Sequence, residues 1–204
     1  MDTGTLIFIV IIVTVPWLAV MIYGSLSSKG VLKSYKSLSD KYGFETDLTK
    51  KSGFRKLPVV KGRYRNIPVE IGSFINQGGR KKSAATYIKA ACTNPSGLEF
   101  VIVKKNRANE IKYGAKSFLI NDAEFDGKFI VNTNNFEKMF SMLNFSIKYK
   151  LLQSLNVGFN GELTLEGNNL SYAENELIKN NINLLRIEIL LHLLCEISDE
   201  LKTN

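Results

Sequence analysis

The longest apolar run of the chain lies near its N-terminus. Leu6 to Tyr23 reads LIFIVIIVTVPWLAVMIY, which is 18 residues without a charge. At about 1.5 Å rise per residue, a helix of this length spans about 27 Å, close to the ~30 Å hydrocarbon core of a bilayer. Pro16 does not oppose this interpretation, because membrane helices tolerate proline. The pattern predicts one transmembrane helix over residues 6–23, preceded by a short external tail at residues 1–5.

Helical spacing of apolar residues returns directly after this segment. Val31, Leu32, Tyr35, Leu38 and Tyr42 recur every three or four positions with lysines between them, and Gly43 follows as a natural stop. We expect a short amphipathic helix from Gly30 to Tyr42 within a basic juxtamembrane segment at residues 24–50. Such a helix either lies on an anionic leaflet or packs against the domain that follows.

The period of the pattern then changes to two. Four strands are predicted at Pro58–Tyr64, Ile67–Asn76, Ala84–Cys92 and Leu98–Lys104. Their connections are short and rich in turn residues, including Thr93–Gly97, which excludes the long crossovers of a parallel sheet. The pattern therefore indicates an antiparallel meander.

The second half of the chain mixes both periods. A strand is expected at Gly127–Asn132, then two helical segments over Asn134–Ser154 with a break near Asn144, then a small meander and a closing helix over Glu174–Leu201. The meander is assigned to Val157–Phe159, Glu162–Glu166 and Asn169–Tyr172. The fold class is therefore α+β, with one domain at residues 51–204 that combines an antiparallel sheet with segregated helices.

The charge of the chain fixes the expected orientation. The net charge is +8, and residues 29–66 carry all of the excess, with eleven basic and three acidic side chains. Positive flanking charge favours the cytoplasmic side. We therefore predict a single-pass cell-membrane protein with its N-terminus outside and its domain in the cytoplasm. A cleaved signal peptide is the alternative, but the charged n-region is missing and the apolar run exceeds the usual ~7–15 residues.

The cysteine and histidine content limits the available chemistry. Cys92 and Cys195 lie in apolar runs and are interpreted as reduced and buried, and His192 is the only histidine. A structural zinc site usually needs four Cys or His ligands. The basic residues are juxtamembrane and no nucleic-acid-binding motif accompanies them, so nucleic acid is not an expected partner. No catalytic, cofactor or metal site is assigned.

An acidic run is the sharpest local motif. Asp122, Glu124 and Asp126 alternate in DAEFDGKFIV, and three oxygen ligands at this spacing would suit a hard cation in a metal-dependent enzyme. The run lacks the later ligands of a calcium loop. The simpler interpretation is a polar turn that leads into a strand, with Phe125, Phe129 and Val131 in the core.

Three further features are candidates for binding. Cations of the first helix and of a predicted hairpin tip are candidates for anionic-lipid contact: Lys29, Lys33, Lys36, Lys41, Arg80, Lys81 and Lys82. On the closing helix, Glu188, His192, Glu196 and Glu200 form one stripe, interpreted as a solvated face. The broad apolar surface of the same helix would serve a homodimer, which makes a homo-oligomeric scaffold a further hypothesis.

The acidic run also carries a resemblance. Asp122, Glu124, Phe125, Asp126, Phe129 and Val131, followed by Leu143, Leu151-Leu152 and Leu170-Ser-Tyr172, resemble the D-x-E-F-D/E-x-x-F-x-V pattern of prokaryotic membrane-anchored proteins of unknown function. About 50 residues are covered, all in the C-terminal half. The resemblance implies a membrane-tethered architecture and no particular activity.

The leading hypothesis is a non-enzymatic, membrane-tethered module that binds a protein partner or the inner leaflet. Its predicted partners are the lipid bilayer through residues 6–23, anionic headgroups, and a protein partner or a second copy of the chain.

Overall fold

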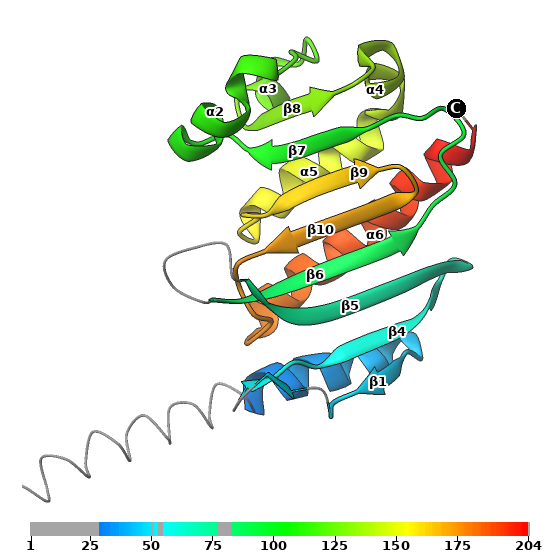
Figure 1. Cartoon of the computed structure of the whole chain (residues 1–204), viewed down its shortest axis with the longest axis vertical. Helices are drawn as coiled ribbons and strands as arrows, with labels where there is room; N and C mark the ends of the chain where they lie inside the picture. Colours follow the sequence, from blue (N-terminus) through cyan, green and yellow to red (C-terminus); the bar gives the residue numbers. More distant parts are fainter. Residues whose placement is uncertain (1–28, 50, 53–54, 77–82, 204) are drawn as a thin grey trace, which may run out of the picture.

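The domain is built around an eight-stranded antiparallel sheet, and the longer helices cover one of its faces (Figure 1). The computed structural model describes residues 29–49, 51–52, 55–76 and 83–203. Eight strands form the sheet in the order β1-β4-β5-β6-β10-β9-β7-β8, and β2 and β3 form a separate two-stranded ribbon. The predicted α+β class with an antiparallel sheet is confirmed.

The strand bounds follow the alternating pattern closely. They are β1 Glu45–Asp47, β2 Lys51–Ser52, β3 Arg55–Lys56, β4 Val59–Tyr64, β5 Ile67–Asn76, β6 Ser83–Ala91, β7 Phe100–Lys104, β8 Phe129–Thr133, β9 Glu162–Glu166 and β10 Asn169–Glu174. All pairings in the large sheet are antiparallel. The three short strands β1, β2 and β3 were not predicted, because two or three residues carry too little periodicity.

The helices occupy the remaining segments. Residues 29–42 are helical, and the later helices are α2 Arg107–Tyr113, η1 Gly114–Lys116, α3 Ala123–Asp126, α4 Phe136–Met142, α5 Phe145–Asn156 and α6 Asn181–Thr203. Asn144 caps α5 by accepting the Ile147 N–H, so the predicted break near Asn144 is confirmed. The closing helix begins at Asn181 and not at Glu174, because Glu174 still pairs in β10.

Two predictions about connections are wrong. Val157–Phe159 is no strand: Val157 caps α5, and the chain then turns through Gly158, whose φ is +85°. The four-strand meander also ends after β6, because the β9–β10 hairpin inserts between β6 and β7. Asn94 joins the two segments in this arrangement, since its side-chain amide donates to the Gly167 carbonyl and ties the Thr93–Gly97 loop to the tip of that hairpin.

The helix at residues 29–42, α6 and α5 cover one face of the sheet (Figure 1). Val31, Tyr35 and Leu38 of the first helix are buried in the same core as the sheet, and the Tyr35 hydroxyl lies 2.9 Å from the Ser73 hydroxyl of β5. This helix therefore packs against the domain, as one of the two interpretations expected. We call the opposite face of the sheet the outer face.

The predicted transmembrane helix at residues 6–23 lies outside the described residues. Within the part of the chain that the structure describes, no helix is both long and apolar enough to cross a membrane.

Candidate binding surfaces

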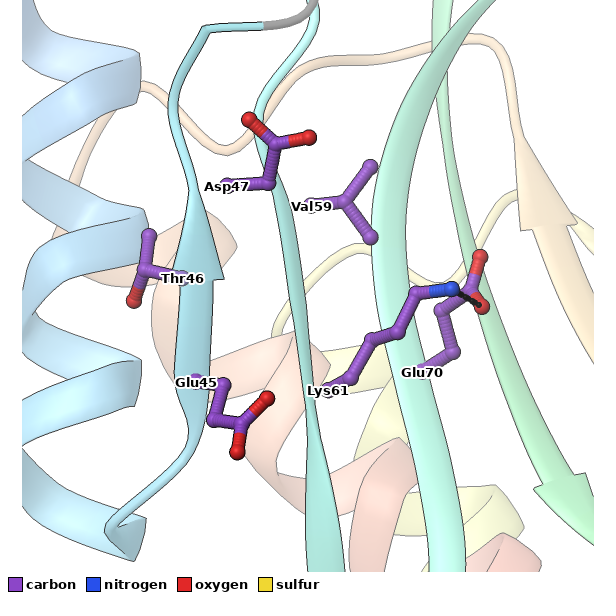
Figure 2. A pocket seen from close by; sticks show the side chains of 6 residues that line it. All are labelled: Glu45, Thr46, Asp47, Val59, Lys61 and Glu70. Atoms are coloured by element: carbon purple, nitrogen blue, oxygen red, sulfur yellow. Dashed lines mark ion pairs between the residues drawn. The ribbon is translucent and has the colours of Figure 1, made fainter.

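The outer face of the sheet carries two open hollows that meet at one ion pair. The smaller hollow, of about 240 Å³, is lined by residues of β1, β4 and β5: Glu45, Thr46, Asp47, Val59, Lys61 and Glu70 (Figure 2). The larger, of about 660 Å³, extends over β6 and β10. Ligand pockets are usually enclosed and mostly apolar. These hollows are open and carry several charges, so they fit a macromolecular surface better than a small molecule.

The ion pair belongs to a row of alternating charges across four strands. The register places Glu45 opposite Lys61, Lys61 opposite Glu70, and Glu70 opposite Lys89. Lys61 Nζ lies 2.9 Å from Glu70 Oε2, and the Tyr87 hydroxyl donates to the other oxygen of Glu70. Such cross-strand pairs stabilise a sheet.

The pKa values of Glu70 and of its partner Tyr87 both move farther from pH 7. Burial acts against the charge of Glu70, but the Tyr87 hydroxyl and the Lys61 ammonium outweigh it and lower the pKa of Glu70. Burial and then Glu70 raise the pKa of Tyr87. A general acid or base works best with a pKa near the working pH, so this pair fits a structural or binding role.

The two aspartates of the acidic run bind backbone N–H groups and a lysine of the protein itself. Asp122 caps α3, with Oδ1 accepting the Phe125 N–H at 3.2 Å and Oδ2 lying 2.6 Å from Lys148 Nζ. Asp126 accepts the N–H groups of Ile120 and Asp122, and Glu124 is exposed. The Lys148 ammonium, followed by the Phe125 N–H, lowers the pKa of Asp122. Both aspartates are therefore engaged with the protein itself.

The aromatic part of the run lies in the core, as the simpler interpretation predicted. Phe125, Phe129 and Val131 are buried. Phe125 and Phe129 stack with their ring centroids 4.9 Å apart. Among the described residues, no group of three or more Cys, His, Asp or Glu side chains is arranged to hold a metal ion.

The polar stripe of α6 forms a seam with the neighbouring helices and with β4, and the expectation of a solvated face is wrong. Glu188, His192, Glu196 and Glu200 are only partly exposed, and each has a partner on another element. Those partners are Lys41 for Glu188, Tyr42 and Tyr64 for His192, Lys150 for Glu196 and Asn144 for Glu200. The stripe holds α6 to its neighbours.

His192 is the centre of an aromatic cluster in this seam. Its Nδ1 lies 3.1 Å from the Tyr64 hydroxyl, and its Nε2 lies 3.4 Å from the Tyr42 hydroxyl. Burial, and then the charge of Arg65, lower the pKa of His192. The imidazole is therefore neutral at pH 7, and it joins the first helix to α6 by packing and hydrogen bonding.

Among the ion pairs of the described residues, Arg186 and Glu174 form the most deeply buried one. Arg186 on α6 is 3% exposed, and its Nη2 lies 2.9 Å from Glu174 Oε1 and 2.7 Å from Glu176 Oε2. The Tyr172 hydroxyl donates to the second oxygen of Glu174, and Arg186 Nη1 donates to the Val157 carbonyl. The arrangement ties β10, α5 and α6 together.

Both cysteines are free thiols. Cys195 is buried, and burial raises its pKa to about 12. Cys92 is half-buried, which corrects the expectation that it lies fully inside, and its Sγ donates to the Asn168 carbonyl. Burial raises the pKa of Cys92 as well, so neither thiol has the thiolate character of a reactive cysteine.

An exposed aromatic cluster at the β8 end of the sheet was missed by the sequence analysis. The rings of Phe118 and Phe136 lie 5.9 Å apart and those of Phe136 and Phe140 lie 6.0 Å apart. Phe140 is 52% exposed and the adjacent Leu119 is 66% exposed. We call Phe118, Leu119, Phe136 and Phe140 the aromatic edge cluster. Its apolar residues resembled core residues in the sequence, because helical periodicity does not tell which apolar face is covered.

The candidate lipid contacts divide into two groups. Lys29, Lys33, Lys36 and Lys41 are exposed on the helix at residues 29–42, and Lys41 pairs with Glu188 at 2.8 Å. Arg80, Lys81 and Lys82 lie outside the described residues. The described cations thus stand on the solvent side of a helix whose other side is in the core.

Comparison with known proteins gives a fold and no family. No protein-family model and no curated protein matches the chain. Among solved structures, the fold is similar to the crystal structure of the mycobacterial trehalose monomycolate transport factor A, TtfA. The TM-score is 0.55, the sequence identity is 16%, and the match covers 85% of this chain and 95% of that chain. The likeness at this identity concerns the fold, and the resemblance carried by Asp122–Val131 stays a prediction.

Proposed function

We propose that this chain is a single-pass membrane protein whose α+β domain acts at the cytoplasmic face as a non-enzymatic binding module. The observation that carries the proposal is the packing of the helix at residues 29–42. Because Val31, Tyr35 and Leu38 lie in the core, only residues 24–28 separate the predicted membrane helix from a folded domain. The domain is therefore held against the bilayer, with no long linker in between.

The charges of the first helix support the same arrangement. Lys29, Lys33 and Lys36 stand on its exposed side, close to the predicted anchor. Basic residues near a membrane helix favour the cytoplasmic side and attract anionic lipid, by about 1 kcal/mol for each cation at the surface. These two effects supply both the orientation and the contact with the leaflet.

The aromatic edge cluster is the best surface for a protein partner. Aromatic residues are enriched in the cores of protein interfaces, and Phe118, Phe136 and Phe140 form one exposed group. Phe118 bridges to β8 and the other two belong to α4, and these elements lie at the sheet edge farthest from the first helix (Figure 1). A module tethered at one end thus presents an apolar surface at the other. The name of the structural neighbour TtfA, a transport factor, supports a role in transport for this binding module.

Two alternatives are less well supported. A metal-dependent enzyme would need Asp122, Glu124 and Asp126 to converge, whereas Asp122 and Asp126 bind backbone N–H groups and Lys148. A homo-oligomer through α6 would need a broad apolar surface on that helix, whereas Ile187, Leu191, Leu194 and Ile197 are buried within the domain and only its first two turns expose large aliphatic residues.

Membrane retention tests the anchor. In cells that produce the full chain, we expect the protein to stay in the membrane pellet after an alkaline carbonate wash, at its full mass of 22.9 kDa. The double variant Val13→Lys/Val15→Lys should move to the supernatant, since each lysine at a helix centre opposes insertion by roughly 2.5–3.5 kcal/mol on insertion scales.

A matched control places the same charges on the domain. Leu119→Lys/Phe140→Lys changes two exposed residues and should leave membrane retention unchanged. Recovery of the unmodified chain in the supernatant, or of a shorter species lacking the first residues, would reject the anchor in favour of a peripheral protein or a cleaved signal peptide.

A further inference from the structure

The helix at residues 29–42 and α6 begin at the same end of the domain. A Cβ placed on Gly30 would come within 2.9 Å of the Lys179 carbonyl oxygen, just before α6 starts. Farther along, Lys41 Nζ lies 2.8 Å from Glu188 Oε1. The two helices therefore run side by side in the same direction, and their first turns lie together.

Two apolar side chains are exposed at this shared end. Ile182 is 63% exposed and Leu185 is 48% exposed. They are three residues apart, so they lie on the same side of α6. Farther along the helix, Leu190, Leu191, Leu193 and Leu194 are buried. Exposure of large aliphatic residues on α6 is therefore concentrated in its first two turns.

Exposed cations occur on the same two segments, which meet at Gly30 and Lys179. Lys29 and Lys33 on the first helix and Lys179 before α6 are exposed. The nearby Glu176 is already paired with Arg186. Protein surfaces that lie at a bilayer interface typically combine aliphatic residues with lysines.

We infer that this end, formed by Lys29, Lys33, Lys179, Ile182 and Leu185, docks on an anionic bilayer, with the two aliphatic side chains entering the headgroup region. The inference rests on the proposed anchoring and adds the face that meets the lipid. We call these five residues the membrane-facing end.

Chain length favours lipid as the occupant. Five residues, 24–28, connect the predicted membrane helix to Lys29, and each spans at most about 3.5 Å. Lys29, the first residue of the membrane-facing end, thus lies within roughly 21 Å of Tyr23, the last residue of that helix. The aromatic edge cluster, by contrast, lies at the β8 edge of an eight-stranded sheet, and strand spacing of about 4.8 Å puts that edge roughly 34 Å from β1.

The experiment measures how close single tryptophans come to lipid. The full chain carries one tryptophan, Trp17, so Trp17→Phe gives a background without tryptophan fluorescence. In this background, Leu185→Trp reports on the membrane-facing end and Leu119→Trp serves as the matched control, since both replaced side chains are exposed leucines. Each protein is placed in nanodiscs of phosphatidylglycerol and phosphatidylcholine, with and without bromine on the acyl chains.

We expect the brominated lipid to reduce the fluorescence of Leu185→Trp about twofold, because interfacial side chains reach the acyl boundary, and to leave Leu119→Trp nearly unchanged. Adding Lys29→Glu, Lys33→Glu and Lys179→Glu to Leu185→Trp should abolish the quenching. Discs of phosphatidylcholine alone should give weaker quenching, because they lack the anionic headgroups.

The outcomes separate this inference from the anchoring. If the protein copurifies with the discs but Leu185→Trp is not quenched, the docking face is wrong while the anchor stands. Equal quenching of both tryptophans would also overturn it, as would quenching that ignores the three charge reversals. A chain that fails to copurify with the discs would defeat the anchoring itself.

Discussion

Replacing Arg186 by Met is expected to lower the free energy of unfolding by about 3–5 kcal/mol, because it leaves Glu174 as an unpaired buried carboxylate. The Arg186 side chain is 3% exposed and that of Glu174 is 1% exposed, so water cannot replace the lost partner. For a domain of this size, such a loss corresponds to a fall in Tm of roughly 6–20 °C. Thermal unfolding of the full chain in mild detergent, followed by circular dichroism, measures it.

Two control variants test whether the loss of stability comes from the buried charge. Lys112→Met breaks an exposed ion pair with Glu162, of which the two side chains are 59% and 43% exposed, and should cost no more than about 1 kcal/mol. The double variant Glu174→Leu/Arg186→Met should recover part of the loss, since no unpaired charge remains. Equal effects of Arg186→Met and Lys112→Met would show that the buried pair is not what joins β10 to α6.

Replacing Phe125 by Ala is expected to cost about 3–5 kcal/mol, the usual range for deleting a buried phenylalanine. Its ring is fully buried and stacks on Phe129, which in turn contacts Phe159. Glu124→Gln, in the same run but exposed, should change the free energy of unfolding by less than about 0.5 kcal/mol. The same unfolding assay compares the two.

If the acidic run bound a metal ion, Glu124→Gln would also lower the stability. If Asp122, Glu124 and Asp126 held a stabilising cation, chelation by EDTA would lower the Tm of the unmodified chain, and Glu124→Gln would lower it too. The hydrogen bonds from Ile120 and Asp122 to Asp126, together with the Lys148 pair, lead us to expect no change with EDTA, calcium or magnesium.

Local patterns predicted much of the fold. Alternation in Pro58–Tyr64 and Ile67–Asn76 was sufficient to place β4 and β5. The two residues that connect these strands, Arg65 and Asn66, have positive φ, at 52° and 65°. The predicted break near Asn144 is correct, and the structure gives its physical reason, since Asn144 caps α5. These features depend on residues that are close together in the chain, so they can be predicted from a single sequence.

Long-range placement was not accessible in the same way. Nothing local indicates that β9 and β10 insert between β6 and β7, since the contact of Asn94 with the Gly167–Asn168 turn joins residues more than seventy positions apart. The stripe on α6 shows the same limit. Periodicity put Glu188, His192 and Glu196 on one side, but only the fold reveals that Lys41, Tyr64 and Lys150 cover it.

The same difference between local and long-range features decides which candidate surfaces could be predicted from the sequence. The exposed lysines of the first helix could be predicted, because charge and helical spacing are properties of a short segment. The aromatic edge cluster and the membrane-facing end could not, because each combines residues from separate elements. Gly30 and Lys179 are neighbours in space and about 150 positions apart in the sequence.

The measurement that tests the central claim most directly is the side of the membrane on which the domain lies. Two reporters are fused in turn to Asn204 of the full chain, one active only in the cytoplasm, such as green fluorescent protein, and one active only outside, such as alkaline phosphatase. We predict fluorescence and no phosphatase activity, with the fusion retained in the membrane. Phosphatase activity without fluorescence would place the domain outside and contradict the account of an inner-face module.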